Sequence, residues 1–409
     1  MASLDVTLLG FTLPDELMAE ILELDPAMPI QTHNFAWRLV GALRHAGVDV
    51  TLLSSSPVSS YPRMPRVLFR GGPIAADGTH GRSLGFVNLL GAKHVTRFLS
   101  CLWFGTRALR RWRPQVLLIH GVHSPHLWFG VLARRLAGVR AVVVLTDPPG
   151  VVLPSDGPIS RTLKSLDVRL VRSALRAMDG VIALTAPLAH DYAPRAPRLV
   201  LEGISDTQPK QRRHAPSRSS SRITLLYAGG LSTSYGVDRL VEAVKGIDLP
   251  GLRLRTLGKG ELAGWIDAEA GADPRIAPTE FLPRADVLAA YRSADLLVQP
   301  RPVDQDFVRY SFPSKLLEYL ASGTPVLTTR LSGIPGDYEG HVSWIDDDST
   351  EGIRTAIATA LDTPRDELIE RGRDAAEFVR STRGPAAQGR RMREFLGSVL
   401  SRGAENRDR

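Results

Sequence analysis

A lysine and a glutamate lie three residues apart at the start of a helical pattern in the segment Phe312-Pro-Ser-Lys-Leu-Leu-Glu-Tyr-Leu-Ala-Ser-Gly323. Ser314 or a neighbouring residue is expected to cap this helix, and the final glycine marks its end. Free N–H groups in the first turn, at Ser314, Lys315 and Leu316, suit a diphosphate when the lysine charge is added. Glu318 lies one turn beyond Ser314 on the same face, where its carboxylate can accept both hydroxyls of a ribose. The simpler alternative is an exposed glutamate paired with Lys315.

A glycine-rich turn forms the second candidate segment, Tyr227-Ala-Gly-Gly-Leu-Ser-Thr-Ser-Tyr-Gly-Val237. A predicted strand ends at Gly229 and Gly230, and a helix follows from about Val237. Glycines at such a turn let the backbone approach a ligand closely and expose N–H groups to it. The turn is not a P-loop, because the Gly-Lys-Ser/Thr ending is missing. A tight turn that binds nothing is the alternative.

Both segments belong to a chain in which short apolar runs alternate with longer helical patterns. In the first half we expect strands at Asp5–Gly10, Val48–Ser54, Gln115–His120, Val139–Thr146, Gly180–Leu184 and Arg198–Leu201, with helices at Thr32–Ala46, Ser124–Ala137 and Arg161–Met178. In the second half we expect strands at Ile223–Ala228, Leu252–Leu257, Leu296–Gln299, Pro325–Thr329 and Ser343–Ile345, with helices at Val237–Val244, Arg284–Arg292, Lys315–Ala321, Thr350–Leu361, Arg365–Val379 and Ala387–Leu400. This alternation predicts an α/β fold with parallel sheets covered on both faces.

The alternation stops over residues 206–222, a stretch rich in proline, serine and basic residues that we interpret as a linker. It separates two doubly wound, Rossmann-like domains, at 1–205 and 223–385. The remaining helix, 386–409, is a candidate to pack back on the N-terminal domain. Such an arrangement places a ligand in a crevice at the carboxyl ends of the strands.

Composition limits the classes of partner. The 409 residues carry a formal charge of +8 and include one cysteine, Cys101, which excludes an intrachain disulfide and a cysteine-based zinc site. No signal peptide or run of eighteen apolar residues occurs, so a cytoplasmic protein is expected. The positive charge fits phosphorylated substrates or an anionic membrane, or reflects arginine-rich composition alone. Nucleic acid is not expected, because zinc-finger, RNP-type and basic repeat motifs are missing.

Together the two segments resemble the donor-binding half of glycosyltransferase family 4, the retaining enzymes of GT-B fold. The Gly-Gly-Leu…Gly-Val-Asp turn and the Pro-Ser-Lys helix match that family in order and spacing. Leu257-Gly-Lys-Gly260, Phe281-Leu-Pro283 and Tyr291–Val298 lie between them, where the family has corresponding elements. The resemblance covers residues 223–347 strongly and the N-terminal half weakly.

The resemblance implies two Rossmann-like domains that face each other across a cleft, and retaining transfer of a sugar from a nucleotide sugar. No metal or other cofactor is implied, and UDP or GDP is the favoured nucleotide. Glu318 would bind the donor ribose, and Gly229 and Gly230 would approach the diphosphate. Residues 257–260, with Phe281 and its neighbour, would border the nucleobase.

Three positions depart from the family pattern, two in the glycine-rich turn and one before the helix. Gly230 and Tyr235 stand where the family often has an arginine and a lysine that neutralise the diphosphate, and Tyr310 stands where it often has a first glutamate. This variant resembles a subgroup associated with surface and capsular polysaccharide assembly. We therefore expect the missing charge to come from other cations, and the candidates are Arg301, Arg309 and Lys315.

The N-terminal half is expected to bind a glycan or lipid-linked acceptor. His120 ends a predicted strand and His123 opens the next helix, and many family members carry a histidine at such a strand end. Asp147 follows the next strand, at about the place where family members often have a histidine that touches the donor sugar. Its carboxylate could accept a sugar hydroxyl or help to deprotonate the acceptor. Hydrogen-bonded structural histidines and an Asp-Pro turn are the alternatives.

Residues 84–113 carry six basic residues and no acidic ones, together with leucine, phenylalanine and tryptophan. A basic helix with an apolar, aromatic face can lie on an anionic membrane, here the inner face of the plasma membrane. The alternative is a helix packed on the N-terminal sheet with its arginines extended to water.

Two other functions are compatible with the same residues. A nucleotide-sugar epimerase of the same fold would bind the donor without an acceptor. A catalytically degenerate partner subunit would explain the missing loop charges. The retention of Lys315 and Glu318 argues against the second alternative.

Overall fold

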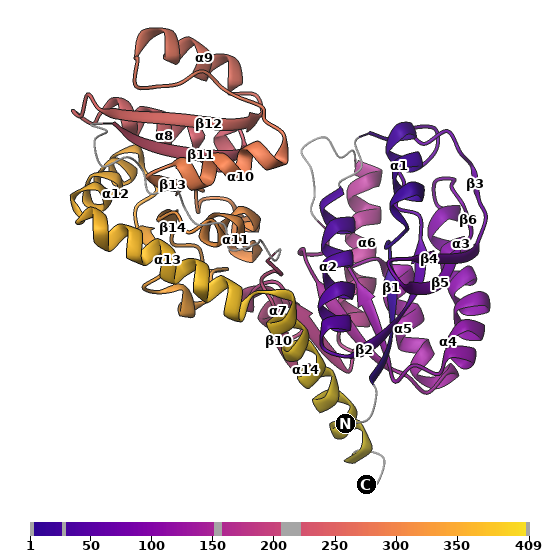
Figure 1. The fold of residues 1–409 in the computed structure, drawn as a ribbon. Coiled ribbons are helices and arrows are strands. Elements are labelled where there is room, and N and C mark those ends of the chain that lie inside the picture. Colours follow the sequence, from indigo (N-terminus) through magenta and orange to yellow (C-terminus); the bar gives the residue numbers. More distant parts are fainter. Residues whose placement is uncertain (1–3, 27–29, 151–157, 206–221, 406–409) are drawn as a thin grey trace. The chain divides into compact units, whose positions relative to one another are not determined.

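The computed structural model describes residues 4–26, 30–150, 158–205 and 222–405. The chain divides into two compact units, which we call unit 1 (Met1–Ile204 with Pro385–Arg409) and unit 2 (Ser205–Gly384). All but the last residue of the predicted linker 206–222 lies outside the described residues. Each unit is built around its own sheet (Figure 1).

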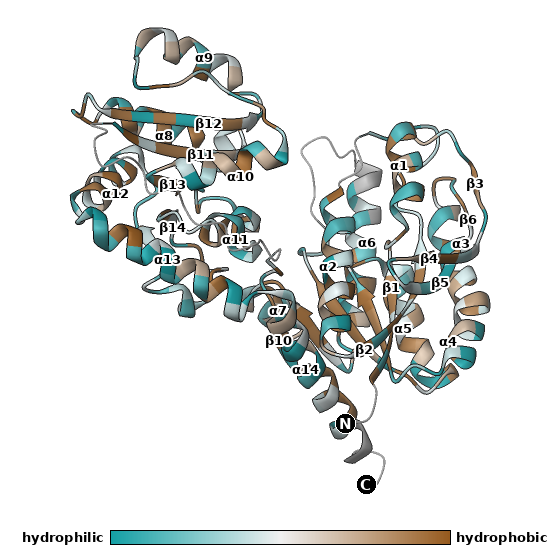
Figure 2. Cartoon of the chain, viewed as in Figure 1, coloured by the Kyte–Doolittle hydropathy of each residue, from teal (hydrophilic) through white to brown (hydrophobic). Residues whose placement is uncertain are grey.

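Unit 1 contains an eight-stranded sheet in the order β10-β9-β8-β7-β1-β2-β5-β4. Its strands pair in parallel except for β4 with β5, which are antiparallel. The strands are β1 (Leu4–Gly10), β2 (Val48–Ser55), β4 (Gly72–Ala76), β5 (Thr79–Leu84), β7 (Val116–His120), β8 (Arg140–Leu145), β9 (Gly180–Ala183) and β10 (Arg198–Val200). Figure 2 shows the central strands in brown, because apolar residues that are covered on both faces dominate them.

Helices α2 (Ile30–His45), α5 (Ser124–Leu136), α6 (Pro158–Leu175) and α7 (Ala186–Tyr192) connect the parallel strands of unit 1, and α1 (Asp15–Leu24) follows β1. The C-terminal helix α14 (Pro385–Glu405) also belongs to this unit. Its Gln388 Nε2 donates to the Gly203 carbonyl at 2.8 Å, and its Arg393 donates to the Ala46 carbonyl at 2.6 Å. A Cβ on Gly389 would lie 1.9 Å from the Ala42 carbonyl oxygen, so only glycine allows α14 this close to α2.

The segment 84–113 is not one amphipathic helix, which corrects part of our expectation. It contains the short strand β6 (Phe86–Val87, paired with β3, Leu68–Phe69), then α3 (Ala92–Ser100), a π-helical turn (Cys101–Gly105) and α4 (Thr106–Trp112). Lys93 and Arg97 point inward and are buried, so two of the six basic residues are not on the surface. The side chains of Leu90, Val95, Leu99 and Trp103 are exposed, and so are those of Arg107, Arg110, Arg111 and Arg113.

Unit 2 contains a five-stranded, fully parallel sheet in the order β12-β11-β13-β14-β15. The strands are β11 (Ile223–Gly230), β12 (Leu252–Lys259), β13 (Leu296–Gln299), β14 (Val326–Thr329) and β15 (Ser343–Ile345). The helices are α8 (Val237–Lys245), α9 (Ala263–Ala272), α10 (Arg284–Ser293), α11 (Ser314–Ala321), α12 (Thr350–Asp362) and α13 (Arg365–Thr382). The predicted strands and helices of both units are present, with ends displaced by a few residues. No helix among the described residues is long and apolar enough to cross a membrane.

Candidate functional site

Helix α11 begins at Ser314, directly after Pro313, and no side chain caps its first turn. Ser314 is the first helical residue and not the expected cap. Because no side-chain oxygen satisfies the N–H groups of Ser314 and Lys315, they are suited to a ligand oxygen. The N–H of Leu316, which we expected to be free, donates to the Pro313 carbonyl at 2.8 Å, and its side chain is fully buried in the core, so Leu316 offers no donor to a ligand.

Glu318 is held by cations from two helices. Its Oε2 accepts from Lys315 Nζ at 3.1 Å, and its Oε1 accepts from Arg284 Nη1 on α10 at 3.1 Å. The carboxylate therefore has a fixed orientation at the start of α11, while 18% of its side-chain surface stays exposed. The pairing with Lys315 was the simpler alternative for this residue. The pairing with Arg284 had no signal in the sequence.

Tyr319 fastens α11 to the end of β11. Its buried hydroxyl accepts from the Ala228 N–H at 2.7 Å and donates to the Ala228 carbonyl at 3.1 Å. Ala228 directly precedes Gly229 and Gly230. One side chain thus places the helix that carries Glu318 beside the glycine turn.

The glycine turn lies against the end of β13. Tyr227 donates from its hydroxyl to the Gly230 carbonyl at 2.9 Å. Gly236, whose φ is +71°, has no room for a side chain, because a Cβ would lie 2.1 Å from the Pro300 carbonyl oxygen. This close approach requires glycine and brings the turn next to Arg301, the residue that follows Pro300.

Arg301 is the best placed of the three candidate cations. Its guanidinium carbon lies 5.3 Å from the ring centroid of Tyr235 and 5.5 Å from that of Phe307. Its Nε is buried without a hydrogen-bond partner, and within the described residues no carboxylate pairs with it. Burial lowers the pKa of Arg301 from its ordinary value. A half-buried guanidinium without an ion-pair partner is suited to an anionic ligand.

The other predicted residues of this half lie in different surroundings. Arg309 is exposed, and the Arg309 guanidinium lies 5.7 Å from the ring centroid of its neighbour Tyr310, which is half-buried. In the predicted nucleobase border, Lys259 Nζ lies 3.8 Å from the ring centroid of the exposed Phe281. A Cβ on Gly258 would lie 1.8 Å from the Gly229 carbonyl oxygen, so this glycine is required where β12 meets the turn.

In unit 1, His120 is the last residue of β7, and Asp147 follows the neighbouring strand β8. The two side chains differ in their exposure to solvent. His120 ends β7 with 1% of its surface exposed, and neither ring nitrogen has a partner. Burial lowers the pKa of His120 to about 4, so the ring is neutral at pH 7. Asp147 is exposed in the loop after β8. Their predicted catalytic roles stay predictions, and in this structure only Asp147 is open to a substrate.

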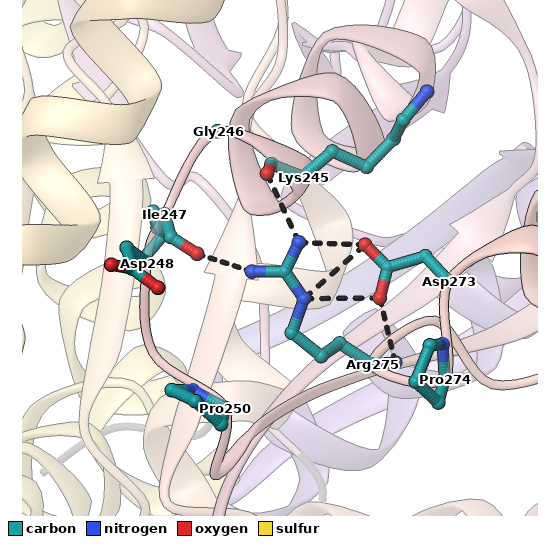
Figure 3. A pocket seen from close by; sticks show the side chains of 8 residues that line it. All are labelled: Lys245, Gly246, Ile247, Asp248, Pro250, Asp273, Pro274 and Arg275. Carbon is teal, nitrogen blue, oxygen red and sulfur yellow. Dashed lines mark hydrogen bonds and ion pairs between the residues drawn. The ribbon is translucent and has the colours of Figure 1, made fainter.

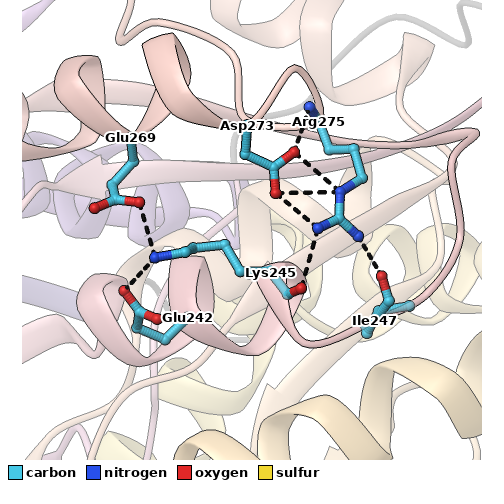
Figure 4. A network of polar contacts seen from close by, with 6 residues as sticks. All are labelled: Glu242, Lys245, Ile247, Glu269, Asp273 and Arg275. Atoms are coloured by element: carbon cyan, nitrogen blue, oxygen red, sulfur yellow. Dashed lines mark hydrogen bonds and ion pairs between the residues drawn. The ribbon is translucent and has the colours of Figure 1, made fainter.

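A pocket of about 400 Å³ lies in unit 2 beside Arg275, before the start of β12 (Figure 3). Arg275 donates to Asp273, to the Lys245 carbonyl and to the Ile247 carbonyl, while Lys245 Nζ binds Glu242 and Glu269 (Figure 4). These charges are already paired with one another. The pocket lies at the amino ends of the parallel strands, whereas the glycine turn follows the carboxyl end of β11. We therefore assign the Arg275 cluster a structural role.

Comparison with known proteins agrees with this division into two units. The pattern of the family described as "Glycosyl transferase 4-like domain" matches residues 32–200, and that described as "Glycosyl transferases group 1" matches residues 222–363. The 2-deoxystreptamine glucosyltransferase of Streptomyces kanamyceticus is 25% identical over 326 residues, which cover 73% of this chain and 80% of that protein.

Two further similarities are weaker, because one covers only part of the chain and the other has low sequence identity. The D-inositol 3-phosphate glycosyltransferase of Corynebacterium glutamicum (strain R) is 33% identical over 115 residues, 28% of this chain and only 26% of that protein. The structure of Anabaena HepE in complex with UDP has a TM-score of 0.61 at 12% identity, covering 97% of this chain and 100% of that one.

The two matched domains and the architecture define the class: the chain is a glycosyltransferase with the GT-B fold, formed by two Rossmann-like domains. Within it, unit 1 carries the 4-like domain, and unit 2, with Glu318 and the glycine turn, carries the group 1 domain.

Proposed function

We propose that the chain is a retaining enzyme of glycosyltransferase family 4. It moves a sugar from a nucleotide sugar, with UDP or GDP as the expected nucleotide, to a glycan or lipid-linked acceptor in cell-surface polysaccharide or glycolipid assembly. The observation that carries this proposal is the fastening of α11 to β11 by Tyr319. This contact supports the proposal because it holds the helix of Glu318, the carboxylate proposed for the ribose, beside the turn proposed for the diphosphate.

Arg301 supplies the charge that the family's usual loop arginine and lysine would supply. Its Nε is unpartnered and buried beside Tyr235, which is one of the two substituted positions. A phosphate removed from water requires such a partner, and a guanidinium offers two parallel donors. Lys315 is the second cation, and it is already at the start of α11.

The acceptor binds unit 1, with Asp147 as the accessible carboxylate that orients or deprotonates the attacking hydroxyl. The names of the two relatives add D-inositol 3-phosphate and 2-deoxystreptamine to the acceptors worth testing. A lipid-linked acceptor would be met at a membrane surface. The exposed side chains of Leu90, Val95, Leu99 and Trp103, with arginines on α4 just beyond them, form the surface proposed for that contact.

The first test is a thermal-shift screen of the protein with UDP-, GDP-, dTDP- and ADP-sugars. A donor at a hundred times its Kd should stabilise unit 2 by about 2.7 kcal/mol. We expect a shift with one nucleotide class that disappears in Glu318→Ala and persists in Glu351→Ala, an exposed glutamate on α12. No shift with any donor in the folded protein would contradict the proposal and favour a partner subunit.

Turnover is the second test, using the donor that the screen identifies and candidate acceptors. The anomeric configuration of the product, read by NMR, should equal that of the donor sugar. An inverted product would contradict the retaining assignment while leaving the donor site intact.

A further inference from the structure

Five nitrogen-bearing side chains gather in unit 1 at the edge where the parallel strands end. We call them the basic cluster: Lys93, His94, Arg97, His123 and His126. The first three lie on α3 and the others at the start of α5, which follows β7. Phe11, directly after β1, joins them, because its ring centroid lies 5.3 Å from that of His123 and 5.1 Å from that of His126. The centroid of His123 lies 5.0 Å from His94 and 4.7 Å from His126.

The lysine and the arginine of the basic cluster are buried without an ion-pair partner among the described residues, and burial lowers the pKa of both. Arg97 is 3% exposed, lies 4.1 Å from the ring centroid of Phe86, and donates from Nη2 to the Ser56 carbonyl, while its Nε has no partner. Lys93 is 7% exposed and donates to the Val58 carbonyl at 2.5 Å. Neither forms an ion pair with a carboxylate in the part of the chain that the structure describes. Their guanidinium and ammonium groups keep donors for a ligand.

The imidazoles of the basic cluster also lack partners. His126 is fully buried, and neither of its ring nitrogens has a hydrogen bond, nor has His123 Nε2. His94 is exposed, whereas His123 is half-buried and its Nε2 is buried. Buried polar atoms are normally hydrogen-bonded. The cluster therefore combines one exposed imidazole, His94, with buried nitrogen atoms that have no partner.

We propose that the basic cluster binds a phosphate group carried by the acceptor, which makes the acceptor an anionic, phosphorylated molecule. This proposal rests on the glycosyltransferase function proposed above. A phosphate supplies the missing counter-charge and accepts hydrogen bonds from Lys93, Arg97 and the imidazoles of His94 and His123.

The composition of the basic cluster favours an anion over a metal ion. Two of its five members carry positive charges that would repel a cation, and no carboxylate belongs to it. Among the described residues, no group of three or more histidine, cysteine, aspartate or glutamate side chains could hold a metal ion. Two carboxylates outside the cluster act on it through their charge, Asp25 on Lys93 and Asp167 on His94. Asp25 accepts from the Ser59 N–H and is paired with Arg63.

The test is to titrate inorganic phosphate into the Arg301→Ala variant and to measure binding by isothermal titration calorimetry. In this variant the proposed donor site of unit 2 is weakened. We expect binding that falls at least tenfold when Lys93→Met or His94→Gln is added. Arg135→Gln, which changes an exposed cation in the last turn of α5 outside the basic cluster, should leave phosphate binding unchanged. The thermal unfolding midpoint of each variant shows whether it folds. If Lys93→Met does not fold, His94→Gln provides the test, because His94 is exposed.

The source of the phosphate is distinguished by two further probes, glucose 6-phosphate against glucose, and monomeric dihexanoyl phosphatidic acid against dihexanoyl phosphatidylcholine. Tighter binding of glucose 6-phosphate than of phosphatidic acid indicates a soluble sugar phosphate as the acceptor. Tighter binding of phosphatidic acid than of glucose 6-phosphate indicates a lipid phosphate. Absence of phosphate binding, or equal binding in the Lys93 and His94 variants, would overturn the proposal. UDP binding to the wild-type protein, measured separately, reports on the donor site alone.

Discussion

Arg284 on α10 and Glu318 on α11 form an ion pair, with 3.1 Å between Nη1 and Oε1, so the carboxylate assigned to the donor ribose is held by a residue 34 positions earlier in the chain. The second oxygen of Glu318 binds Lys315. Arg284 is not among the residues assigned to the donor, so we expect its effect on binding to be exerted through Glu318.

We predict that Arg284→Ala weakens UDP binding about threefold to tenfold and leaves binding of 2′,3′-dideoxy-UDP nearly unchanged. The effect is modest because 54% of the Arg284 side chain is exposed, and water screens exposed pairs. Only a nucleotide with ribose hydroxyls uses the orientation of Glu318. Calorimetry with both nucleotides checks this, and Arg284→Lys should restore part of the loss. An equal loss for both nucleotides would show that Arg284 acts elsewhere.

Arg301→Ala should weaken UDP binding about tenfold to a hundredfold while leaving uridine binding unchanged. A charge-assisted hydrogen bond to phosphate contributes about 1.5–3 kcal/mol, and uridine has no phosphate. The matched control is Arg309→Ala, which removes an exposed arginine shortly before α11. If the Arg309 variant loses as much as the Arg301 variant, the assignment of the diphosphate charge to Arg301 is wrong.

The buried histidines should make unit 1 sensitive to acid. Burial lowers the pKa of His126 to about 3, from its ordinary 6.5. The unfolded chain therefore binds a proton below pH 6.5 that the folded chain does not, and stability present above pH 6.5 is lost as the pH falls. At pH 5 this costs about 2 kcal/mol for such a histidine.

His126→Phe should remove that part of the acid sensitivity, because phenylalanine has similar volume and no proton to bind. Urea unfolding at pH 7.5 and pH 5.0 measures the difference in the free energy of unfolding. The exposed His190 provides the control, since His190→Gln should keep the wild-type difference. A His126→Phe protein that loses as much stability as the wild type would refute the explanation.

The Arg275 cluster should matter for stability and not for donor binding. Arg275→Ala leaves Asp273 and the carbonyls of Lys245 and Ile247 without their donor, which we expect to cost about 2–4 kcal/mol of unfolding free energy. Arg354→Ala, which removes an exposed pair on α12, should cost less than about 1 kcal/mol. Thermal unfolding measures both, and UDP affinity should be unchanged. A large loss of UDP affinity in folded Arg275→Ala would mean that the pocket beside it belongs to the functional site.

Membrane contact through α3 and the π-helical turn predicts that Leu99→Glu with Trp103→Glu abolishes most binding to vesicles of phosphatidylglycerol. These side chains are 55% and 62% exposed. A carboxylate at either position would be repelled by the anionic headgroups and would not partition into the apolar layer below them. Co-sedimentation measures the bound fraction. Leu166→Glu, at an exposed leucine on α6, is the control. Equal loss in the control, or none in the double variant, would refute this surface.

The sequence predicted those parts of the site that depend on local signals. Pro313 and Ser314 mark the start of α11, and Gly229 and Gly230 mark the end of β11. Such residues act on the backbone within a few positions, so the helix start and the glycine turn could be located from the sequence. Helix α9 was missed because it is rich in alanine and glycine and buries only Ile266, which leaves no amphipathic stripe.

Contacts between distant segments could not be predicted in the same way. Arg284 reaches Glu318, and Tyr319 reaches Ala228, only after α10, α11 and β11 have packed together. Lys93 and Arg97 were placed on a membrane-facing surface because charged residues are normally exposed. Their burial depends on the carbonyl groups of Val58 and Ser56, which lie in another segment of the chain.

Helix α14 joins unit 1 although it is synthesised after unit 2. Gln388 and Arg393 satisfy carbonyl groups at Gly203 and Ala46, on segments that leave the ribosome far earlier. Unit 1 therefore reaches its complete form only after unit 2 has been translated, and a fragment that ends near residue 204 exposes the side of α2 that α14 covers. In folding order, unit 2 behaves as an insertion that can form first, while the N-terminal unit waits for the synthesis of α14.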